Sequence, residues 1–400
     1  MWFNTIANTG AYLGPEGIYA PSNVSGSITW TGAGQPIGDG LLTPSVEVWS
    51  NSSTAAAFSI SLTVVDPTGA VVATASGAGT STPNGVTVWT PPSPVLALPG
   101  ASLWHLVEAP LRPSLYTLVT TLSLGGAPVE SANTTFGVRR TEWDAATGFY
   151  LNGVATKILG AANHQDFAAL GVGFPDVIQW NRVANMKAGG FNGWRTAHNP
   201  PTPALLTAMD ELGMLCWDEN HRNGQFDQVP LLVRRDRNHP SVIIWSICNE
   251  VLCNCADDKN AARNMTALFH SLDPLGQRLV SANQNGWLGP GTPLDLQGID
   301  YATNTYDAVH KALPSVPAMS SETSSAVGDR GVYANNFSAG HVEGYDRDYP
   351  GWGQTAEGAW GGIGESNGQG ILTRPFIAGG WVWTYWDYRG EPTPTAWVRK

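Results

Sequence analysis

Charge is scarce in this sequence. Of the 400 residues, 13% are Asp, Glu, Lys or Arg, against a usual share of roughly 25%. The 21 Lys and Arg residues form no basic block, and the formal net charge is −11. Because nucleic-acid binding needs clustered basic side chains, this composition excludes a nucleic-acid partner.

Long apolar runs are also missing. No stretch approaches the roughly 18–20 apolar residues that a membrane-spanning helix needs, so no membrane partner is expected. The start, MWFNTIANTG, lacks a basic segment followed by an apolar one, and no signal peptide is recognisable. N-x-S/T triplets lean weakly towards a secreted or vacuolar protein but leave the compartment unknown; they begin at Asn23, Asn51, Asn133, Asn264 and Asn336.

Cysteine is rare as well. Cys216 and Cys248 lie in apolar, strand-like runs, which predicts buried thiols. Cys253 and Cys255 form a lone C-x-C without the spacing of zinc sites, so the cysteines predict no metal centre.

Tryptophan, in contrast, is abundant, with 17 residues. Aromatic rings suit carbohydrate, because the C–H faces of a sugar pack on them while its hydroxyl groups reach polar groups at the ring edge. A large hydrophobic core also takes up tryptophan. The count alone leaves both uses open.

Residues 1–138 lack helical periodicity. Short alternating segments, among them SVEVWS, FSISLTVVD and LYTLVTTL, are separated by Gly, Pro, Asn and Asp. The stretch VVDPTGAVVA has the composition of a hairpin with a Pro-Thr-Gly turn. This pattern predicts a small all-β, immunoglobulin-like sandwich.

From about Asp144 short apolar strands alternate with helical stretches. Such alternation predicts a parallel sheet, and eight units over about 250 residues predict an α/β fold of the TIM (β/α)₈ barrel type. The predicted strands lie at 157–163, 191–196, 214–219, 241–250 and 278–283, and in LQGIDYAT, VPAMSSE and FIAGGWVWTYWDY.

Polar residues stand at the carboxyl ends of several of these strands. In TIM barrels that end of the strands carries the active site. The residues are Asn163-His164, Arg195, His198, Asp218-Glu219, Asn249-Glu250, Asp300-Tyr301, Glu322 and Trp383.

Glu250 and Glu322 form the most informative pair among them. Glycoside hydrolysis needs two carboxyl groups beside one bond, one of which holds a proton near neutral pH. The two residues are 72 positions apart (322 − 250), or three βα units of 24 residues, which places them at the ends of strands 4 and 7. Glu250 follows an apolar strand, so burial is expected to raise its pKa.

Other uses of these residues stay open. Any single Glu at a strand end can be a salt-bridged structural carboxylate. Asp218-Glu219 is a rival pair, although adjacent strand residues face opposite ways and at most one of the two can face the site. Arg195 could hold carboxylates in place, and a lone His such as His164 is more often structural than catalytic.

Five stretches together resemble glycoside hydrolase family 2, which contains β-galactosidases, β-glucuronidases and β-mannosidases. RRDRNHPSVIIWSICNE is close to the family's acid/base signature, and SETSSAVGDRGVY is similar to its nucleophile segment in bacterial-type β-galactosidases. The similarity covers most of residues 137–400, and the matching stretches are GFYLNGVATKILGAANHQD, NMKAGGFNGWRTAHNPPTPALLTAMDELGMLCWDE, RRDRNHPSVIIWSICNE, SETSSAVGDRGVY and PFIAGGWVWTYWDYRGEPTP.

The resemblance implies a role for each matching position. Glu250 would protonate the leaving oxygen and then activate water, and Glu322 would form the covalent glycosyl-enzyme. Asn249 would bind the sugar 2-hydroxyl group. The remaining residues of the sugar subsite would be Arg195, His164, His198 and Tyr301, with Trp383 as its floor.

Members with this barrel usually begin with a jelly-roll domain. We interpret residues 1–22 as a remnant of such a domain, residues 23–138 as the sandwich and residues 139–400 as the catalytic barrel. The family's Mg²⁺ site is not carried over, because DENHRNGQFD lacks a good match to the Glu and His after strand 3. No metal and no other cofactor is therefore expected.

The resulting hypothesis is a retaining exo-β-glycosidase. Its expected partner is a β-linked oligosaccharide or glycoside, and the nucleophile segment favours a β-galactosidase that removes terminal β-D-galactose. The Asn-x-Lys element with which β-glucuronidases bind the sugar carboxylate is not found after Glu322. A β-mannosidase, a β-glucuronidase and an inactive carbohydrate-binding fragment remain alternatives, and the oligomeric state stays unknown.

Overall fold

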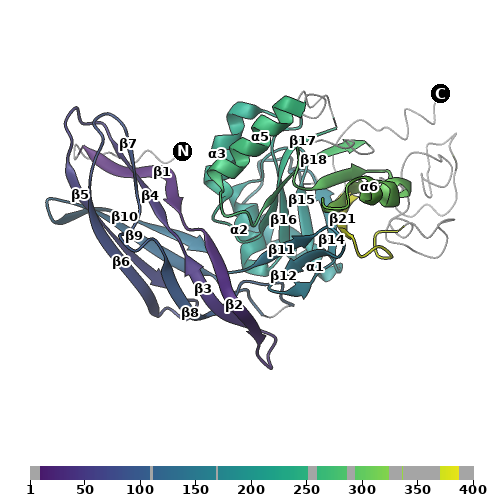
Figure 1. The fold of residues 1–400 in the computed structure, drawn as a ribbon, viewed down its shortest axis with the longest axis horizontal. Coiled ribbons are helices and arrows are strands. Elements are labelled where there is room, and N and C mark those ends of the chain that lie inside the picture. The colour runs from purple at the N-terminus through teal and green to yellow at the C-terminus, as the bar shows by residue number, and fades with distance from the viewer. Residues whose placement is uncertain are drawn as a thin grey trace. The chain divides into compact units, whose positions relative to one another are not determined.

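The computed structural model describes residues 10–108, 111–167, 170–250, 259–285, 293–323, Asn336 and 370–386. The chain divides into two units. One consists of residues 1–140 and 231–240, and the other consists of residues 141–230 and 241–400. Figure 1 draws the strands of the first unit in purple to blue and those of the second in blue-green to yellow.

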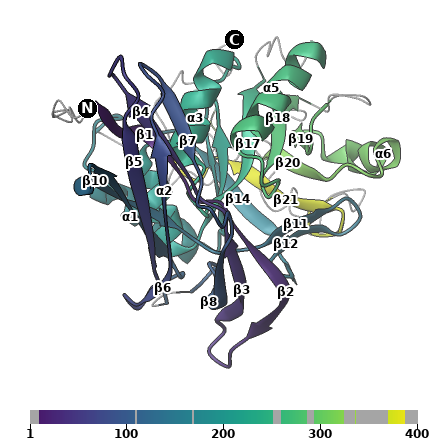
Figure 2. The ribbon, with the colours of Figure 1, turned by 60° about the vertical axis from the view of Figure 1, so that its left-hand side comes forward.

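The first unit is a β-sandwich of antiparallel strand pairs, as predicted. One sheet has the order β10-β9-β5-β6, and two smaller sheets have the orders β1-β4-β7 and β2-β3-β8 (Figure 2). The strands are β1 (Ala11–Tyr19), β2 (Ser22–Trp30), β3 (Pro36–Leu42), β4 (Ser45–Ser50), β5 (Ala57–Val65), β6 (Val71–Thr80), β7 (Val86–Trp89), β8 (Leu96–Ser102), β9 (Tyr116–Leu124) and β10 (Ala127–Phe136).

Alternation of side chains along β5 explains how this unit forms a core. Ile60 and Leu62 are fully buried, while the serines on either side of Ile60 are exposed. The predicted hairpin is confirmed, because β5 pairs antiparallel with β6 and the Asp66 carboxylate accepts hydrogen bonds from the N–H groups of Thr68 and Ala70. β1 pairs with β4 in the same unit. The interpretation of residues 1–22 as a domain remnant stays a prediction.

The second unit contains a closed barrel of eight parallel strands, which confirms the predicted fold class. Each predicted strand overlaps an observed one. In chain order these are β14 (Ile158–Asn163), β15 (Gly193–Thr196), β16 (Leu215–Glu219), β17 (Val242–Asn249), β18 (Leu279–Asn285), β19 (Gln297–Asp300), β20 (Ala318–Thr323) and β21 (Ile377–Trp383).

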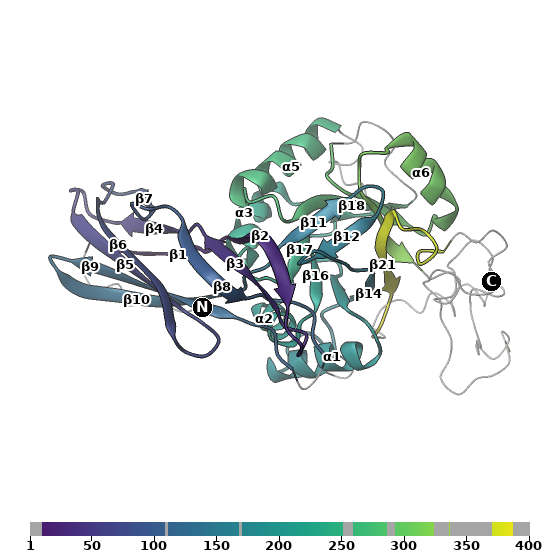
Figure 3. The same ribbon diagram turned by 60° about the horizontal axis from the view of Figure 1, so that its bottom comes forward.

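Helices lie outside the ring of strands (Figure 3). The described ones are α1 (Val177–Ala188), α2 (Pro203–Leu212), α3 (Val229–Asp236), α5 (Lys259–Leu272), α6 (Tyr306–Ala312) and the short 3₁₀ turns η1 (Phe226–Gln228) and η2 (Thr303–Thr305). A small antiparallel sheet precedes the barrel and is formed by β11 (Thr141–Asp144), β12 (Gly148–Leu151) and β13 (Val154–Ala155). Among the described helices, none has the length and apolar character needed to cross a membrane.

Tryptophan fills much of the barrel interior. Trp217 and Trp381 are fully buried with their rings edge-on at 5.9 Å, and a Cβ atom at Gly160 would lie 2.1 Å from the Trp381 ring. Glycine at that position therefore makes room for the indole. Part of the high tryptophan content thus belongs to the core, whereas Trp383, at the carboxyl end of β21, stays partly exposed.

The two cysteines that were predicted to be buried thiols differ. Cys216 is a buried thiol outside any disulfide, which confirms the prediction. Cys248 is disulfide-bonded, so the prediction of a thiol there is wrong. An apolar strand indicates that a cysteine is buried, but it does not indicate whether the sulfur is oxidised. Cys253 and Cys255 lie outside the described residues.

Candidate active site

Arg195, at the end of β15, is the centre of a buried hydrogen-bond network. Its Nε donates to Glu219 Oε2 and its Nη1 donates to Glu322 Oε1, each at 2.8 Å. Nη1 also donates to the Ser321 carbonyl at 2.7 Å, and Nη2 donates to Asn249 Oδ1. Burial opposes the charged form, but Glu219 and Glu322 outweigh it and raise the pKa of Arg195. The guanidinium is therefore a fixed positive charge that holds carboxylates from two strands.

His198 follows β15 and has two principal polar neighbours, Glu219 and Asn249, while Arg195 Nη2 lies farther from its Nδ1, at 3.3 Å. Its Nδ1 lies 2.9 Å from Glu219 Oε1, and its Nε2 lies 3.4 Å from Asn249 Nδ2. A carboxylate requires a donor and an amide nitrogen requires an acceptor, so Nδ1 carries the proton and Nε2 accepts. The carboxylate of Glu219 thus fixes the tautomer of His198.

Glu219 is the member of the Asp218-Glu219 pair that faces this network. One of its oxygens accepts from His198, and the other accepts from Arg195 and from Asn283 Nδ2 at 3.0 Å. With both oxygens engaged, Glu219 has the contacts of a structural carboxylate rather than those of an acid or nucleophile.

His164, His198 and Trp383 form an aromatic wall beside the network. The Trp383 ring stacks on His198, with a centroid distance of 5.0 Å and an interplanar angle of 7°. His164 meets both rings edge-on, at 5.1 Å and 5.5 Å. Burial, and then the neighbouring His198, lower the pKa of His164 to about 4, so this ring is neutral near pH 7. Flat rings next to buried polar groups can accept one face of a sugar.

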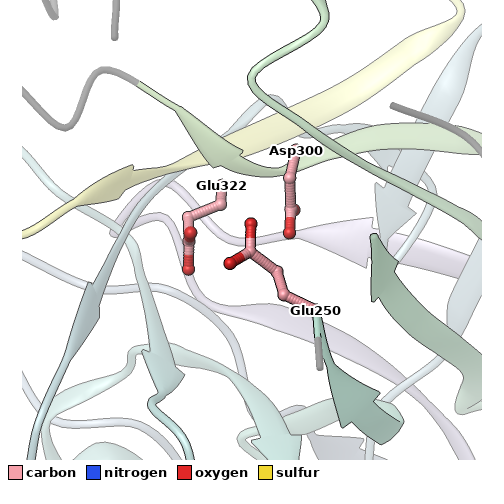
Figure 4. A group of neighbouring side chains, drawn as sticks. All are labelled: Glu250, Asp300 and Glu322. Atoms are coloured by element: carbon pink, nitrogen blue, oxygen red, sulfur yellow. The ribbon is translucent and has the colours of Figure 1, made fainter. Parts of the chain in front are cut away.

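Three carboxyl groups meet at the carboxyl ends of β17, β19 and β20. One oxygen each of Glu250, Asp300 and Glu322 lies within 4.8 Å of the other two, and the Glu250 carboxyl group lies between those of Asp300 and Glu322 (Figure 4). Burial, and then the charge of Glu322, raise the pKa of Glu250. The same two causes raise the pKa of Asp300 well above its ordinary value. Carboxyl groups this close cannot all ionise near neutral pH.

The backbone is unusual at two of the predicted site residues. Glu250 has a φ of 43° and Tyr301 has a φ of 52°, a left-handed conformation that side-chain-bearing residues rarely adopt. The Glu250 N–H donates to the Asn283 carbonyl and the Tyr301 N–H donates to the Glu322 carbonyl, both at 2.9 Å. Such conformations cluster at functional sites, where the surrounding structure holds them.

The structure brings the eight predicted site residues into one region of the barrel. Arg195 bonds directly to Asn249 and Glu322, and Tyr301 reaches Glu322 through its backbone. The remaining predicted residues join through ring contacts or through the carboxyl cluster: His164, His198, Trp383 and Glu250.

Three residues of this region were given no role in the sequence-based hypothesis: Glu219 and Asp300, which were named only as strand-end residues, and Asn283, which was not named. Each stands near the end of a predicted strand, so the sequence carried a signal for all three. Spacing along a strand does not indicate which of two adjacent polar residues faces the barrel interior, so the sequence could not show that these three side chains contact the site.

A metal ion is a poor fit to the carboxyl cluster, although it has the spacing for one in the described parts of the chain. Ca²⁺ takes six to eight oxygen ligands and Mg²⁺ takes six in a regular octahedron. Here Glu322 already accepts from the Arg195 guanidinium, and Asp300 accepts from the Ser321 hydroxyl. A guanidinium in the ligand shell repels a cation, so we assign no metal to these residues.

Comparison with known proteins identifies the family. Residues 28–139 match the description "Glycosyl hydrolases family 2", and residues 145–229 and 223–311 match "Glycosyl hydrolases family 2, TIM barrel domain". The chain belongs to glycoside hydrolase family 2. Both units described above therefore have counterparts in that family, which confirms the resemblance seen in the sequence.

Relatives in family 2 carry more than one activity in their names. A β-galactosidase, BoGH2A of Bacteroides ovatus, is 28% identical over 346 residues, which are 71% of this chain and 40% of that protein. Human β-glucuronidase is 30% identical over 217 residues, 50% of this chain and 33% of that protein. The chain thus spans less than half the length of these relatives.

A solved structure has the same fold. A family 2 member from Bacteroides cellulosilyticus superposes with a TM-score of 0.75 at 24% identity, over 94% of this chain and 46% of that one. At this identity the match supports the fold alone. The substrate has to be argued from the residues of the site.

Proposed function

We propose that the chain is a retaining exo-β-glycosidase that removes terminal β-D-galactose, with residues 139–400 as the catalytic barrel. Glu322 is the nucleophile and Glu250 is the acid/base. The observation that carries the proposal is the carboxyl pair, whose nearest described oxygens lie within 4.8 Å. Retaining glycosidases keep the two groups about 5–5.5 Å apart, while inverting ones need roughly 6.5–9.5 Å to admit a water molecule.

The surroundings of the two residues suit opposite tasks. Arg195 donates to Glu322 Oε1, so a buried positive charge lies directly beside the group assigned as the nucleophile. Glu250 is partly buried next to Glu322, and both effects raise its pKa, which favours the protonated form that a general acid requires. The environments thus divide acid and nucleophile between two residues of the same type.

Two displacements then follow. The Glu322 carboxylate attacks the anomeric carbon, while Glu250 gives its proton to the oxygen of the departing aglycone. The glycosyl–Glu322 ester is then attacked by water, whose proton passes to Glu250. The second step restores both residues, and the sugar leaves with its original anomeric configuration.

The sugar pocket is assigned to the surrounding residues. Asn249, which Arg195 and His198 hold beside Glu250, is assigned to bind the 2-hydroxyl group. Trp383 forms the floor, and His164, His198, Arg195 and Tyr301 line the pocket. The guanidinium nitrogens of Arg195 are all engaged within the protein, so Arg195 offers no donor to a glucuronate carboxylate. This favours a neutral glycone such as galactose.

β-Glucuronidase is the second candidate, because family relatives bear that name. A panel of aryl β-glycosides separates the two: preferential release of the aglycone from the β-galactoside supports the proposal, and preference for the β-glucuronide contradicts it. Proton NMR of the first product reports the anomeric configuration. An initial α-anomer would contradict the retaining mechanism, and sugar binding without hydrolysis would identify an inactive binding protein.

A further inference from the structure

Asp300 is a third carboxyl group in the proposed active site, and the mechanism above does not use it. It ends β19, where it pairs in register with Glu322 of β20, and its side chain is 1% exposed. Its Oδ1 accepts a hydrogen bond from the Ser321 hydroxyl. Its Oδ2 is buried and has no hydrogen-bond partner among the described residues.

A second unpartnered oxygen lies in the same cluster. Glu250 Oε1 is also buried without a hydrogen-bond partner in the described structure. Figure 4 shows one oxygen of Glu250 on the Asp300 side and the other on the Glu322 side. A buried oxygen without a donor costs free energy, and two carboxyl groups that face each other satisfy both oxygens if one of them holds a proton.

The excess of carboxyl groups around Asp300 also indicates that some of these groups are protonated. Four carboxyl groups, Glu219, Glu250, Asp300 and Glu322, lie around one buried guanidinium, that of Arg195. The charge of the exposed Arg222 also acts on Glu250, so with all four carboxyl groups ionised the net charge of these groups would be −4 + 2 = −2. A buried site does not sustain such an excess. Glu219 and Glu322 are the two that Arg195 contacts, so the protons belong on Glu250 and Asp300.

We propose that Asp300 is a positioning residue that stays a neutral carboxylic acid throughout the reaction and donates a hydrogen bond to Glu250 when Glu250 is a carboxylate. The inference rests on the proposed function. Asp300 keeps its proton in every step, so no proton is gained or lost beyond the exchange between Glu250, the leaving oxygen and water. Its hydrogen bond stabilises the carboxylate that forms as the aglycone departs.

A proton fits this position better than a divalent cation. The cation would have to share Glu322 with the Arg195 guanidinium and would displace the acid proton from Glu250. A neutral Asp300 keeps both residues in the states that the reaction needs. The two alternatives make different predictions for substitutions at Asp300.

The pH profile of kcat/KM tests the proposal through two variants. If Asp300 is neutral, Asp300→Ala removes a donor to the Glu250 carboxylate, so the pKa of Glu250 rises and the alkaline limb moves to higher pH. We expect kcat to fall about 10- to 100-fold, the usual effect of losing a hydrogen bond to a charged group. Asp300→Asn keeps a neutral donor and should restore most of kcat, with the alkaline limb close to that of the native protein.

An ionised Asp300 would give the opposite sign. Removal of a negative charge would lower the pKa of Glu250, so both variants would move the alkaline limb to lower pH. That result would overturn the proposal. A merely structural role would lower the melting temperature of the Ala variant without moving the limb, which would overturn it equally.

A direct measurement keeps this test apart from the proposed activity. Infrared spectra of protein carrying ¹³C-labelled aspartate carboxyl groups should contain a protonated-carboxyl band at pH 7 that Asp300→Asn lacks. Asp144→Asn is the matched control, because Asp144 is exposed and hydrogen bonds lower its pKa. If the native protein lacks the band, or gains it only after treatment with a chelator, Asp300 is ionised or holds a cation and the inference is wrong, whether or not the protein hydrolyses glycosides.

Discussion

The strands of the sandwich and the strands of the barrel bury different kinds of side chain. In β1 to β10 the described charged side chains are exposed or half-buried, and one apolar face of each strand forms the core. Four barrel strands bury ionisable groups completely or nearly so, namely Arg195, Asp218, Glu219, Asp300 and Glu322. Buried charge is costly, so a strand that needs only to fold avoids it. The contrast supports the proposal that the barrel carries the active site.

The largest expected effect is on activity. Glu322→Gln removes the attacking carboxylate but keeps an oxygen that can accept from Arg195. We expect kcat on an aryl β-galactoside to fall by a factor on the order of 10⁴, with a smaller loss of stability than in Arg195→Met because Arg195 keeps Glu219 as its ion-pair partner. The matched control is Glu108→Gln, an exposed residue of the sandwich unit, which should retain native kinetics. Equal activity of Glu322→Gln and the native protein would remove Glu322 from the mechanism.

Substitution of Arg195 should affect both activity and stability. Arg195→Met leaves the carboxylates of Glu219 and Glu322 buried without their cation, and breaking a buried pair in this way costs about 3–5 kcal/mol. Urea unfolding measures the loss. Arg195→Lys keeps the charge but cannot replace the four contacts, so it should lie between the native protein and Arg195→Met. A fully stable Arg195→Met protein would show that the network does not depend on this charge.

In the sandwich a core substitution should affect stability alone. Ile60→Ala removes a fully buried side chain of β5 and should cost about 2–5 kcal/mol. The kcat/KM of the protein that remains folded should not change. Ser61→Ala, on the exposed face of the same strand, is the control and should change stability by less than about 0.5 kcal/mol. Altered kinetics in Ile60→Ala would mean that the sandwich contributes to the site.

The smallest expected effect is on the pH dependence of stability. The pKa of Asp300 is raised in the folded protein, so above its ordinary pKa the unfolded chain binds fewer protons there than the folded chain does. Its contribution to the free energy of unfolding therefore falls as pH rises from that ordinary value towards the raised one. Asp300→Asn should gain stability relative to the native protein over this range. The difference between the two unfolding curves measures the effect, and a difference independent of pH would contradict the raised pKa.

The periodicity of apolar residues in the sequence was sufficient to predict the fold of both units. Alternating residues in segments such as β5 predicted the sandwich, because one face of each strand has to be apolar. Continuous apolar runs such as VIIWSIC predicted parallel barrel strands, because those strands are covered on both faces. The same reasoning placed Glu250 and Glu322 at strand ends three units apart, and the family resemblance added their roles.

Inward-facing polar residues were harder to predict. The Asp218-Glu219 pair was left open because adjacent residues on a strand face opposite ways and register is not readable from spacing. Cys248 was wrongly predicted to be a thiol, since oxidation depends on a partner elsewhere in the chain. Both questions concern which groups meet in space.

By itself the sequence determined the two fold types and the eight strands and placed Glu250 and Glu322 at strand ends, because each of these follows from local patterns of polarity and spacing. Only the tertiary structure decided that Arg195 holds Glu219 and Glu322 together, that Glu219 orients His198, and that Asp300 stands beside Glu250. The physical reason is the closure of the barrel, which brings together the carboxyl ends of β15, β16, β17, β19 and β20. The pKa of each group at these ends therefore depends on charged residues that are distant in the sequence.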